Sequence, residues 1–320
     1  MSPRAESAPG YRSAGYAAAL RVQGTPVLLG ATGGWVFSRP IAGTGRTDLV
    51  GPYPLFCCAD WSALRPALSG TLPLEPVTAT LVTEPFCPLS PNALADMFDV
   101  CRVLHNHWLI DLTAPLTPSR HHRRKLKRAQ GVRIEAAPAD PAMAADWVRL
   151  YGTLVARKRI SDLRAFSADS LSAQLGVPGA HLVSAWEGRR MIGADLYYVD
   201  GPVAYAHLSA YAPEGYARAV SYPMIAVAAE YFRVLADVLD LGGAPAAEAG
   251  HEGGGVAHFK RGWTTLTRPS YLCGKIFDAA AYARLSGGTE VAWFPAYRNG
   301  EFAGTGIRPS ITSIEPVGGR

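Results

Sequence analysis

Two adjacent cations, Lys260 and Arg261, follow a glycine-rich stretch that begins at the end of a predicted strand. The stretch opens with Val238-Leu-Asp-Leu-Gly-Gly243 and continues to Gly253-Gly-Gly255. A strand, a flexible loop and a basic helix in this order place positive charge beside free backbone amides, a setting that suits an oxyanion. A lysine there can stabilise the charge that develops when an amine attacks an ester carbonyl. The alternative is a surface loop followed by an ordinary basic helix.

Alternation along the predicted strand Val203–Tyr211 gives that strand one polar face. The face carries Val203, Tyr205, His207, Ser209 and Tyr211. If it lines a cleft, His207 relays a proton, and Tyr205, Ser209, Tyr211 and the nearby Asp240 bind substrate. The alternative is that these side chains are half-exposed residues of an ordinary sheet.

A short segment, residues 119–130, holds the densest positive charge in the chain. Its cations are Arg120, Arg123, Arg124, Lys125, Lys127 and Arg128. Thr117 is expected to cap a helix here, with Pro118 in the first position and Gly131 after the end. His122, Leu126 and Ala129 can face the protein while the cations face outward. The surface is either a solvated face or a contact for nucleic-acid phosphates.

The composition indicates a compact globular protein. The 320 residues are 48% hydrophobic and 18% charged, which argues against a disordered or fibrous chain, and the length suits either a duplicated architecture or one large α/β unit. Five cysteines without CxxC spacing are interpreted as small buried hydrophobes, and no metal site is predicted. There is no GxxxxGK[ST] or GxGxxG motif. Without a leader or a run of eighteen apolar residues, we expect a cytoplasmic protein that does not span a membrane.

Periodicity and turn residues predict an alternating order of strands and helices. Strands are expected at 26–29, 35–38, 53–56, 78–82, 107–112, 132–136, 181–186, 191–199, 203–211, 238–241 and 270–276. Helices are expected at 61–68, 92–102, 119–130, 140–157, 167–175, 222–235 and 256–262. This order is typical of an α/β fold with mixed strand directions, and the tails, 1–10 and 304–320, are expected to be disordered.

The ordered set of motifs between residues 107 and 265 resembles the FemAB family of the GNAT superfamily. The set comprises His107-Trp-Leu-Ile-Asp-Leu112 with the basic helix, Leu150-Tyr151 to Arg157-Lys158, the strand Ala204 to Ser209, Asp240-Leu-Gly-Gly243, and Phe259-Lys260-x-Gly262. The resemblance implies a mixed α+β fold of two GNAT-like lobes with mixed sheets, the second better defined. The lobes would span 11–131, completed by part of 280–303, and 132–280.

The same resemblance implies an aminoacyltransferase. Lys260 and Phe259 would lie at the transferred carbonyl and the tRNA 3′ end, and the cations of helix 119–130, with Arg261, would approach tRNA phosphates. Aminoacyl-tRNA would be the co-substrate with no other cofactor, and the acceptor would be the amine of a natural-product or cell-wall precursor. The chain departs from the peptidoglycan enzymes because it has no room for a coiled-coil arm and because Gly262-Trp263-Thr264 follows the lysine.

Two other functions stay open at this stage. An acyl-CoA-dependent N-acyltransferase would use the same fold, but the Arg/Gln-x-x-Gly-x-Gly/Ala loop that holds pyrophosphate at a helix N-terminus is missing. The nearest match, Arg128-Ala-Gln-Gly131, lies at a helix C-terminus, where the dipole repels phosphate. A non-catalytic nucleic-acid-binding protein would explain the basic helix alone.

Overall fold

The computed structural model describes residues 8–301, except 71, 73–74, 130, 161–163, 245–254 and 289–292. Within the described residues a single mixed sheet of eleven strands runs through the molecule, in the order β1-β2-β3-β4-β11-β5-β10-β9-β8-β7-β6. The predicted tails lie outside the described residues, apart from 8–10, and so does most of the glycine-rich stretch before Lys260.

The bounds of the elements are as follows. The strands are β1 (Thr25–Leu28), β2 (Trp35–Ile41), β3 (Arg46–Val50), β4 (Thr78–Val82), β5 (Val100–Asp111), β6 (Arg133–Pro138), β7 (Ala180–Glu187), β8 (Arg190–Asp200), β9 (Val203–Tyr211), β10 (Val238–Asp240) and β11 (Thr267–Ile276). The α-helices are α2 (Ala14–Ala19), α3 (Leu64–Ser69), α4 (Pro91–Ala95), α5 (Arg120–Arg128), α6 (Ala144–Lys158), α7 (Ala168–Leu175), α8 (Pro213–Ala217), α9 (Ser221–Phe232), α11 (Gly255–Arg261) and α12 (Ala279–Ser286). Short 3-10 turns are η1 (Gly10–Arg12), η2 (Arg21–Gln23), η3 (Gly30–Thr32), η4 (Pro141–Met143) and η5 (Ala296–Arg298).

The predicted mixed α/β class is confirmed. The pairs β3–β4 and β9–β10 are parallel, and every other neighbouring pair is antiparallel. The predicted meander is confirmed as β7, β8 and β9, whose turns carry Gly188 at φ 59° and Gly201 at φ 57°. Glycine adopts these left-handed angles without the steric cost that a Cβ imposes.

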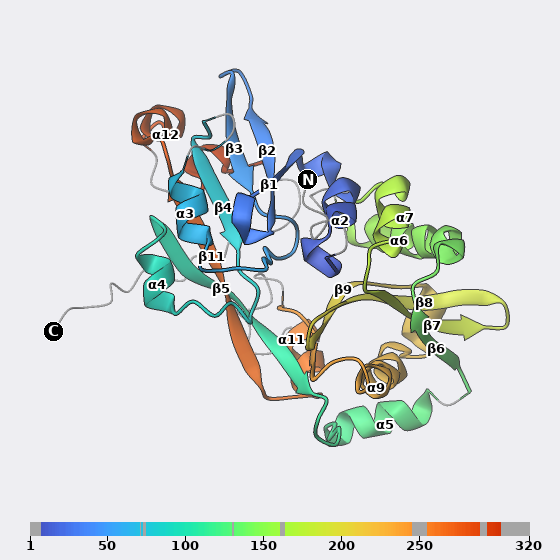
Figure 1. Cartoon of the computed structure of the whole chain (residues 1–320). Helices are drawn as coiled ribbons and strands as arrows, with labels where there is room; N and C mark the ends of the chain where they lie inside the picture. Colours follow the sequence, from blue (N-terminus) through green and yellow to red (C-terminus); the bar gives the residue numbers. More distant parts are fainter. Residues whose placement is uncertain are drawn as a thin grey trace.

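Helices cover both faces of the second half of the sheet. In Figure 1, α6 and α7 lie on one face of β6–β9, and α9 lies on the other. Trp147, Leu150 and Tyr151 of α6 are buried, as their helical spacing predicts. The main hydrophobic core joins them to Tyr16 of α2 and Phe37 of β2, so packing is continuous between the two halves of the sheet.

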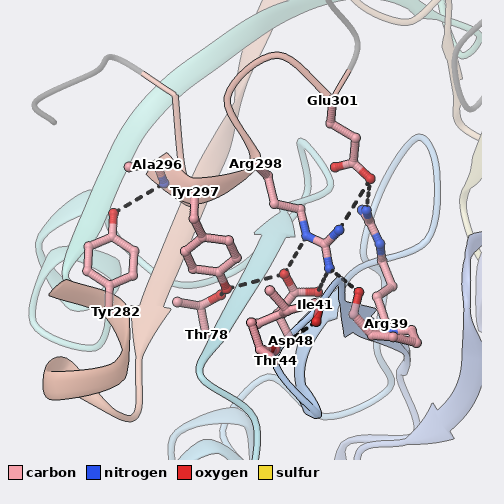
Figure 2. Close-up of polar contacts among 11 residues, drawn as sticks. Arg39, Ile41, Thr44, Asp48, Thr78, Tyr282, Ala296, Tyr297, Arg298 and Glu301 are labelled. Carbon is pink, nitrogen blue, oxygen red and sulfur yellow. Dashed lines mark hydrogen bonds and ion pairs between the residues drawn. The ribbon is translucent and has the colours of Figure 1, made fainter. Parts of the chain in front are cut away.

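The segment after β11 returns to the first half of the sheet. Figure 2 shows Arg298 between Asp48 and Glu301, with Tyr297 turned toward Thr78. The guanidinium of Arg298 donates to both carboxylate oxygens of Asp48, at 2.6 and 3.0 Å, and Asp48 is 3% exposed. A charge this buried is retained only when it is paired, so the contact fixes this segment on β3.

Three local predictions were wrong. Residues 53–56 form no strand, and only Phe56 makes a single bridge, to Thr83. The predicted helix at 92–102 ends at Ala95, and β5 begins at Val100. Strand β3 was missed because its sequence, Arg46-Thr-Asp-Leu-Val50, carries no clean alternation of apolar and polar residues.

Three of the five cysteines are small residues of the core, and the other two are not. Cys57, Cys58 and Cys273 are buried, as predicted, whereas Cys87 and Cys101 are partly exposed. Burial raises the pKa of all five thiols, that of Cys87 to about 12, so each stays protonated at neutral pH.

Candidate active site

The ammonium of Lys260 lies where β9 and β10 part. These parallel strands pair over only three positions, ending at Tyr205 and Asp240, although β9 continues to Tyr211. Lys260 Nζ donates to the carbonyl oxygen of Gly243 at 2.6 Å. A Cβ placed on Gly242 would lie 3.5 Å from Nζ and 4.0 Å from the carbonyl oxygen of Ala206. The ammonium is therefore held against backbone at the opening of the sheet.

Asp240, predicted to bind substrate, has its carboxylate engaged by the protein. His107 Nδ1 lies 2.8 Å from Oδ2 and 3.1 Å from Oδ1, and the backbone N–H of Gly242 donates to Oδ1 at 2.7 Å. His107 and Asp240 are 5% and 1% exposed. Sequence reasoning missed His107 as a site residue. The signal was present in His105-Asn-His107, which places two imidazoles on one face of a strand.

His105 lies beside the same residues. A Cβ on Gly243 would lie 2.6 Å from the Cβ of His105, so the glycine is needed for this close approach. Burial, followed by electrostatic interactions with His107 and Lys260, lowers the pKa of His105 to about 4. The ring is therefore uncharged at neutral pH and adds no positive charge next to Lys260.

The predicted polar face of β9 is divided between the two faces of the sheet. The register against β8 shifts so that Tyr197 pairs with Ala206 and Leu196 pairs with Leu208, which leaves His207 as the extra residue of a bulge. A bulge reverses the inward and outward alternation beyond it. Tyr205 and His207 therefore face the side covered by η1 and α7, whereas Ser209 and Tyr211 face the other side. The prediction of one continuous polar face was wrong for this reason.

Tyr205 connects the strand to a carboxylate that sequence reasoning did not single out. Its hydroxyl donates to Glu84 Oε2 at 2.6 Å, and Trp61 Nε1 donates to the other carboxylate oxygen at 3.3 Å. Burial raises the pKa of Glu84. Glu84 stands alone in a Thr-Glu-Pro-Phe loop, and no local pattern marks it as functional.

His207 lies among tyrosine rings with both nitrogens occupied. Tyr11 OH lies 3.2 Å from Nδ1, and Gln174 Oε1 lies 2.8 Å from Nε2. Because the amide oxygen only accepts, Nε2 carries the hydrogen and Nδ1 accepts from Tyr11. Burial lowers the pKa of His207 to about 3. This geometry keeps the ring neutral and leaves it no nitrogen for the proton relay that the sequence predicts.

On the opposite face, Tyr211 and Ser209 surround another acid. Tyr211 OH donates to Asp195 Oδ1 at 2.6 Å. Asp195 is 1% exposed, and burial raises its pKa to about 6. Ser209 is exposed. These two predicted substrate-binding residues therefore do not join the group around Lys260.

The basic helix α5 is docked on the helix that carries Lys260. Ser119, not the predicted Thr117, caps α5 by accepting from the backbone N–H of His122 at 3.3 Å. The His122 imidazole is buried, and its Nε2 lies 2.8 Å from the carbonyl oxygen of Phe259. The Phe259 ring packs 5.5 Å from that of His122 and 5.0 Å from that of Tyr222. Phe259, which is predicted to be catalytic, thus packs α11 against α5 and α9.

The cations of α5 face outward without acidic neighbours. Arg120, Arg123, Arg124, Lys127 and Arg128 are exposed, and Lys125 is partly exposed. Among the described residues none of the six makes an ion pair. Exposed arginines elsewhere do so, as in Arg190–Glu214 and Arg218–Glu187. Arg261 is exposed on α11. The outer surface of α5 therefore carries a high density of positive charge, and it lies next to α11, the helix that carries Lys260.

A pocket of about 340 Å³ lies apart from this group. It is lined by Arg133, Trp186 and Arg218, among others, and none of the residues around Lys260 contributes to it. Its arginines pair with Glu135 and Glu187, so it offers no net positive charge.

Within the described part of the chain, no group of three or more His, Cys, Asp or Glu side chains is arranged to hold a metal ion. None of the described helices has the length and apolarity needed to cross a membrane.

Comparisons with known proteins agree with this architecture. Residues 118–261, which run from α5 to α11, match the acetyltransferase (GNAT) domain family. FemX is similar in structure, with 12% identity and a TM-score of 0.62 over 85% of this chain and 93% of FemX. L-PGS from Bacillus licheniformis is also similar, with 13% identity and a TM-score of 0.53 over 83% of this chain and 92% of that protein.

A third similar structure is the C-terminal domain of a protein from Agrobacterium fabrum assigned as a lysylphosphatidylglycerol synthetase. It shares 16% identity and a TM-score of 0.58 over 84% of this chain and 89% of the domain. No curated protein matches the sequence. The comparisons define the class of fold: the protein has a GNAT-type acyltransferase fold, and residues 118–261 match the model of the acetyltransferase (GNAT) domain.

Proposed function

We propose that this protein transfers an aminoacyl group from aminoacyl-tRNA to the amine of a small-molecule acceptor and forms an amide. The observation that carries the proposal is the docking of α5 on α11. His122 joins a helix of six cations, none of which forms an ion pair with a described residue, to the helix that holds Lys260. A polyanion bound along α5 would be held next to a fixed ammonium group.

The chemistry requires little beyond alignment and charge stabilisation. An aminoacyl ester is already activated, so an acceptor amine attacks its carbonyl carbon directly. The ammonium of Lys260 is fixed by its hydrogen bond to Gly243, and its positive charge would stabilise the developing oxyanion. FemX and lysylphosphatidylglycerol synthetase, which share the fold, support an aminoacyl donor, and the FemAB resemblance of the Asp240 to Gly262 motifs supports the same donor.

Acyl-CoA is the less favoured donor. The connection between β9 and α9, where the missing pyrophosphate loop would lie, instead forms the short helix α8 with Glu214 in its first turn. A Cβ on Gly215 would lie 2.2 Å from the carbonyl oxygen of Ile192, so this turn is packed tightly on β8. A carboxylate and a closely packed backbone do not suit a pyrophosphate.

The test uses the purified protein with an extract of its source cells that supplies the acceptor. We expect labelled amino acid to pass from charged tRNA into a small-molecule product, and RNase treatment to abolish the product. Product formation that survives RNase, or that depends on an acyl-CoA instead of charged tRNA, would overturn the proposal. Uncharged tRNA at the same concentration is the control for nonspecific effects of RNA.

A further inference from the structure

A buried histidine–carboxylate pair lies next to Lys260 and has no part in the function proposed so far. His107 Nδ1 faces both oxygens of Asp240, at 2.8 and 3.1 Å. A carboxylate only accepts hydrogen bonds, so Nδ1 carries the hydrogen and Nε2 keeps its lone pair in the neutral ring. Among the described residues nothing donates to Nε2, although His107 is 5% exposed. An oriented lone pair of this kind, on a largely buried ring, is suited to accept a proton.

The pair is connected to Lys260 through two residues. Asp240 Oδ1 accepts from the backbone N–H of Gly242 at 2.7 Å, and Gly242 packs against the Lys260 ammonium. The carbonyl oxygen of Gly243 accepts from Lys260 Nζ at 2.6 Å, and Gly243 packs on His105, which shares a face of β5 with His107. The ammonium and the imidazole therefore approach the same place, where β9 and β10 part.

We propose that His107 is the proton acceptor for the attacking amine and that Asp240 is its positioning residue. This inference rests on the proposed aminoacyl transfer and names the group that moves its proton. His207, the histidine favoured by the sequence, has both ring nitrogens hydrogen-bonded within the protein, whereas His107 has a described partner at Nδ1 only.

The steps balance without a further reactant. The amine nitrogen forms a bond to the ester carbonyl carbon, and the carbonyl π electrons move to the oxygen, whose charge faces Lys260. The amine proton passes to His107 Nε2, and Asp240 stabilises the resulting imidazolium. The bond from carbon to the ribose oxygen then breaks, and His107 returns the proton to that oxygen, which leaves as the tRNA hydroxyl.

The charged and titratable groups around His107 are few. Asp240 on β10 is its hydrogen-bond partner, His105 precedes it on β5, and Lys260 approaches from α11. Arg268 on β11 is its register partner. Glu84 contacts Tyr205, which is the register partner of Asp240. Among the described residues only Asp240 makes a direct hydrogen bond to the ring, so its loss should act on His107 first.

The experiment measures single-turnover transfer from charged tRNA to the extract acceptor over pH 5–9. We expect His107→Gln to lower the rate on the order of 100-fold or more, with tRNA affinity unchanged, and to remove the decline of rate at low pH that belongs to the imidazole. We expect Asp240→Asn to move that decline to lower pH, because the imidazolium loses its carboxylate. His181→Gln, which replaces a half-buried histidine on β7 that bonds Tyr231, is the matched control.

The outcomes separate the two proposals. If the wild type transfers nothing from charged tRNA, the proposed function fails. If the wild type is active and folded His107→Gln keeps its rate and pH profile, the role of His107 is overturned and aminoacyl transfer stands. Should His107→Gln not fold, Asp240→Asn decides: a shifted decline at low pH supports the role, and an unchanged profile overturns it.

Discussion

The imidazole of His122 occupies the space that a side chain at residue 262 would need. A Cβ on Gly262 would lie 1.9 Å from His122 Cε1 and 2.4 Å from both ring nitrogens. The backbone N–H of Ser119 also donates to the Gly262 carbonyl at 2.8 Å. Gly262, which follows the helix that carries Lys260, therefore leaves the space in which His122 packs α5 on α11. This contact gives the glycine of the Phe259-Lys260-x-Gly262 stretch a structural role.

Gly262→Ala is expected to displace α5 from α11. Overpacking of this kind costs roughly 1–3 kcal/mol of stability and should weaken tRNA binding. Denaturant unfolding and tRNA titration measure the two effects. His122→Ala in the same chain removes the clash, so the double variant should be less destabilised than the sum of the singles. Gly152→Ala, at an open position in α6, is the control. Additive effects of the two substitutions would contradict this account.

Charge reversal on α5 should change the salt dependence of tRNA binding. If these cations contact tRNA phosphates as proposed, replacing Arg123, Arg124 and Lys127 by Glu removes three contacts, and the slope of log affinity against log salt should fall by roughly 0.7–0.9 per contact. Reversal of the exposed Arg21, Arg65 and Arg284, which lie on other elements, gives the same net charge. An equal change of slope in both triple variants would show that net charge, not this surface, governs binding.

Lys260→Ala should lower single-turnover transfer by roughly 100-fold or more, since one oxyanion donor contributes on that order. Its affinity for tRNA should change only a few-fold, because the ammonium is turned toward Gly243 and not along the α5 surface. Arg261→Ala, the neighbouring exposed cation, should show the reverse, with weaker binding and a nearly normal rate. Circular dichroism checks that both variants fold. A Lys260→Ala enzyme with a normal rate would remove the lysine from the mechanism.

Asp195 should make the protein less stable as pH rises. Its pKa is raised from 3.8 to about 6 in the folded chain, so between these values the folded state keeps a proton that the unfolded state has lost. The free energy of unfolding therefore falls as pH rises through this window, by about 3 kcal/mol for roughly two units. Unfolding of the wild type and of Asp195→Asn at pH 4 and pH 7 measures the difference. Parallel pH profiles would be inconsistent with the raised pKa.

Arg298→Ala should destabilise the fold by about 3 kcal/mol, because it leaves the buried carboxylate of Asp48 without an ion-pair partner and with only the hydroxyl of Tyr297 as a described side-chain donor. Urea unfolding measures the loss. Arg133→Ala, which breaks the exposed pair with Glu135, is the comparison and should change stability by about 0.5 kcal/mol or less. Similar losses in the two variants would mean that burial of the Arg298 contact adds nothing.

Turn residues and helical spacing predicted much of this fold, because turns and amphipathic helices depend on residues that are close together in the sequence. Gly188 and Gly201 indicated the meander, and the spacing of Trp147, Leu150 and Tyr151 predicted the buried face of α6. The bulge at His207 could not be read from the sequence, since strand register depends on the partner strand. The contact between His107 and Asp240 joins residues 133 positions apart, so no spacing rule could find it.

Strand β5 passes through the centre of the sheet with His107 near one end. It pairs with β11 from Val100 to Trp108 and with β10 from Leu109 to Asp111, so one uninterrupted backbone belongs to both halves of the molecule. Hinge-like opening of the halves would require breaking this ladder and the common core around Tyr16 and Tyr198. His107 on β5 and its partner Asp240 on β10 belong to this ladder, so, if they act as proposed, substrates must fit a preformed histidine–carboxylate pair.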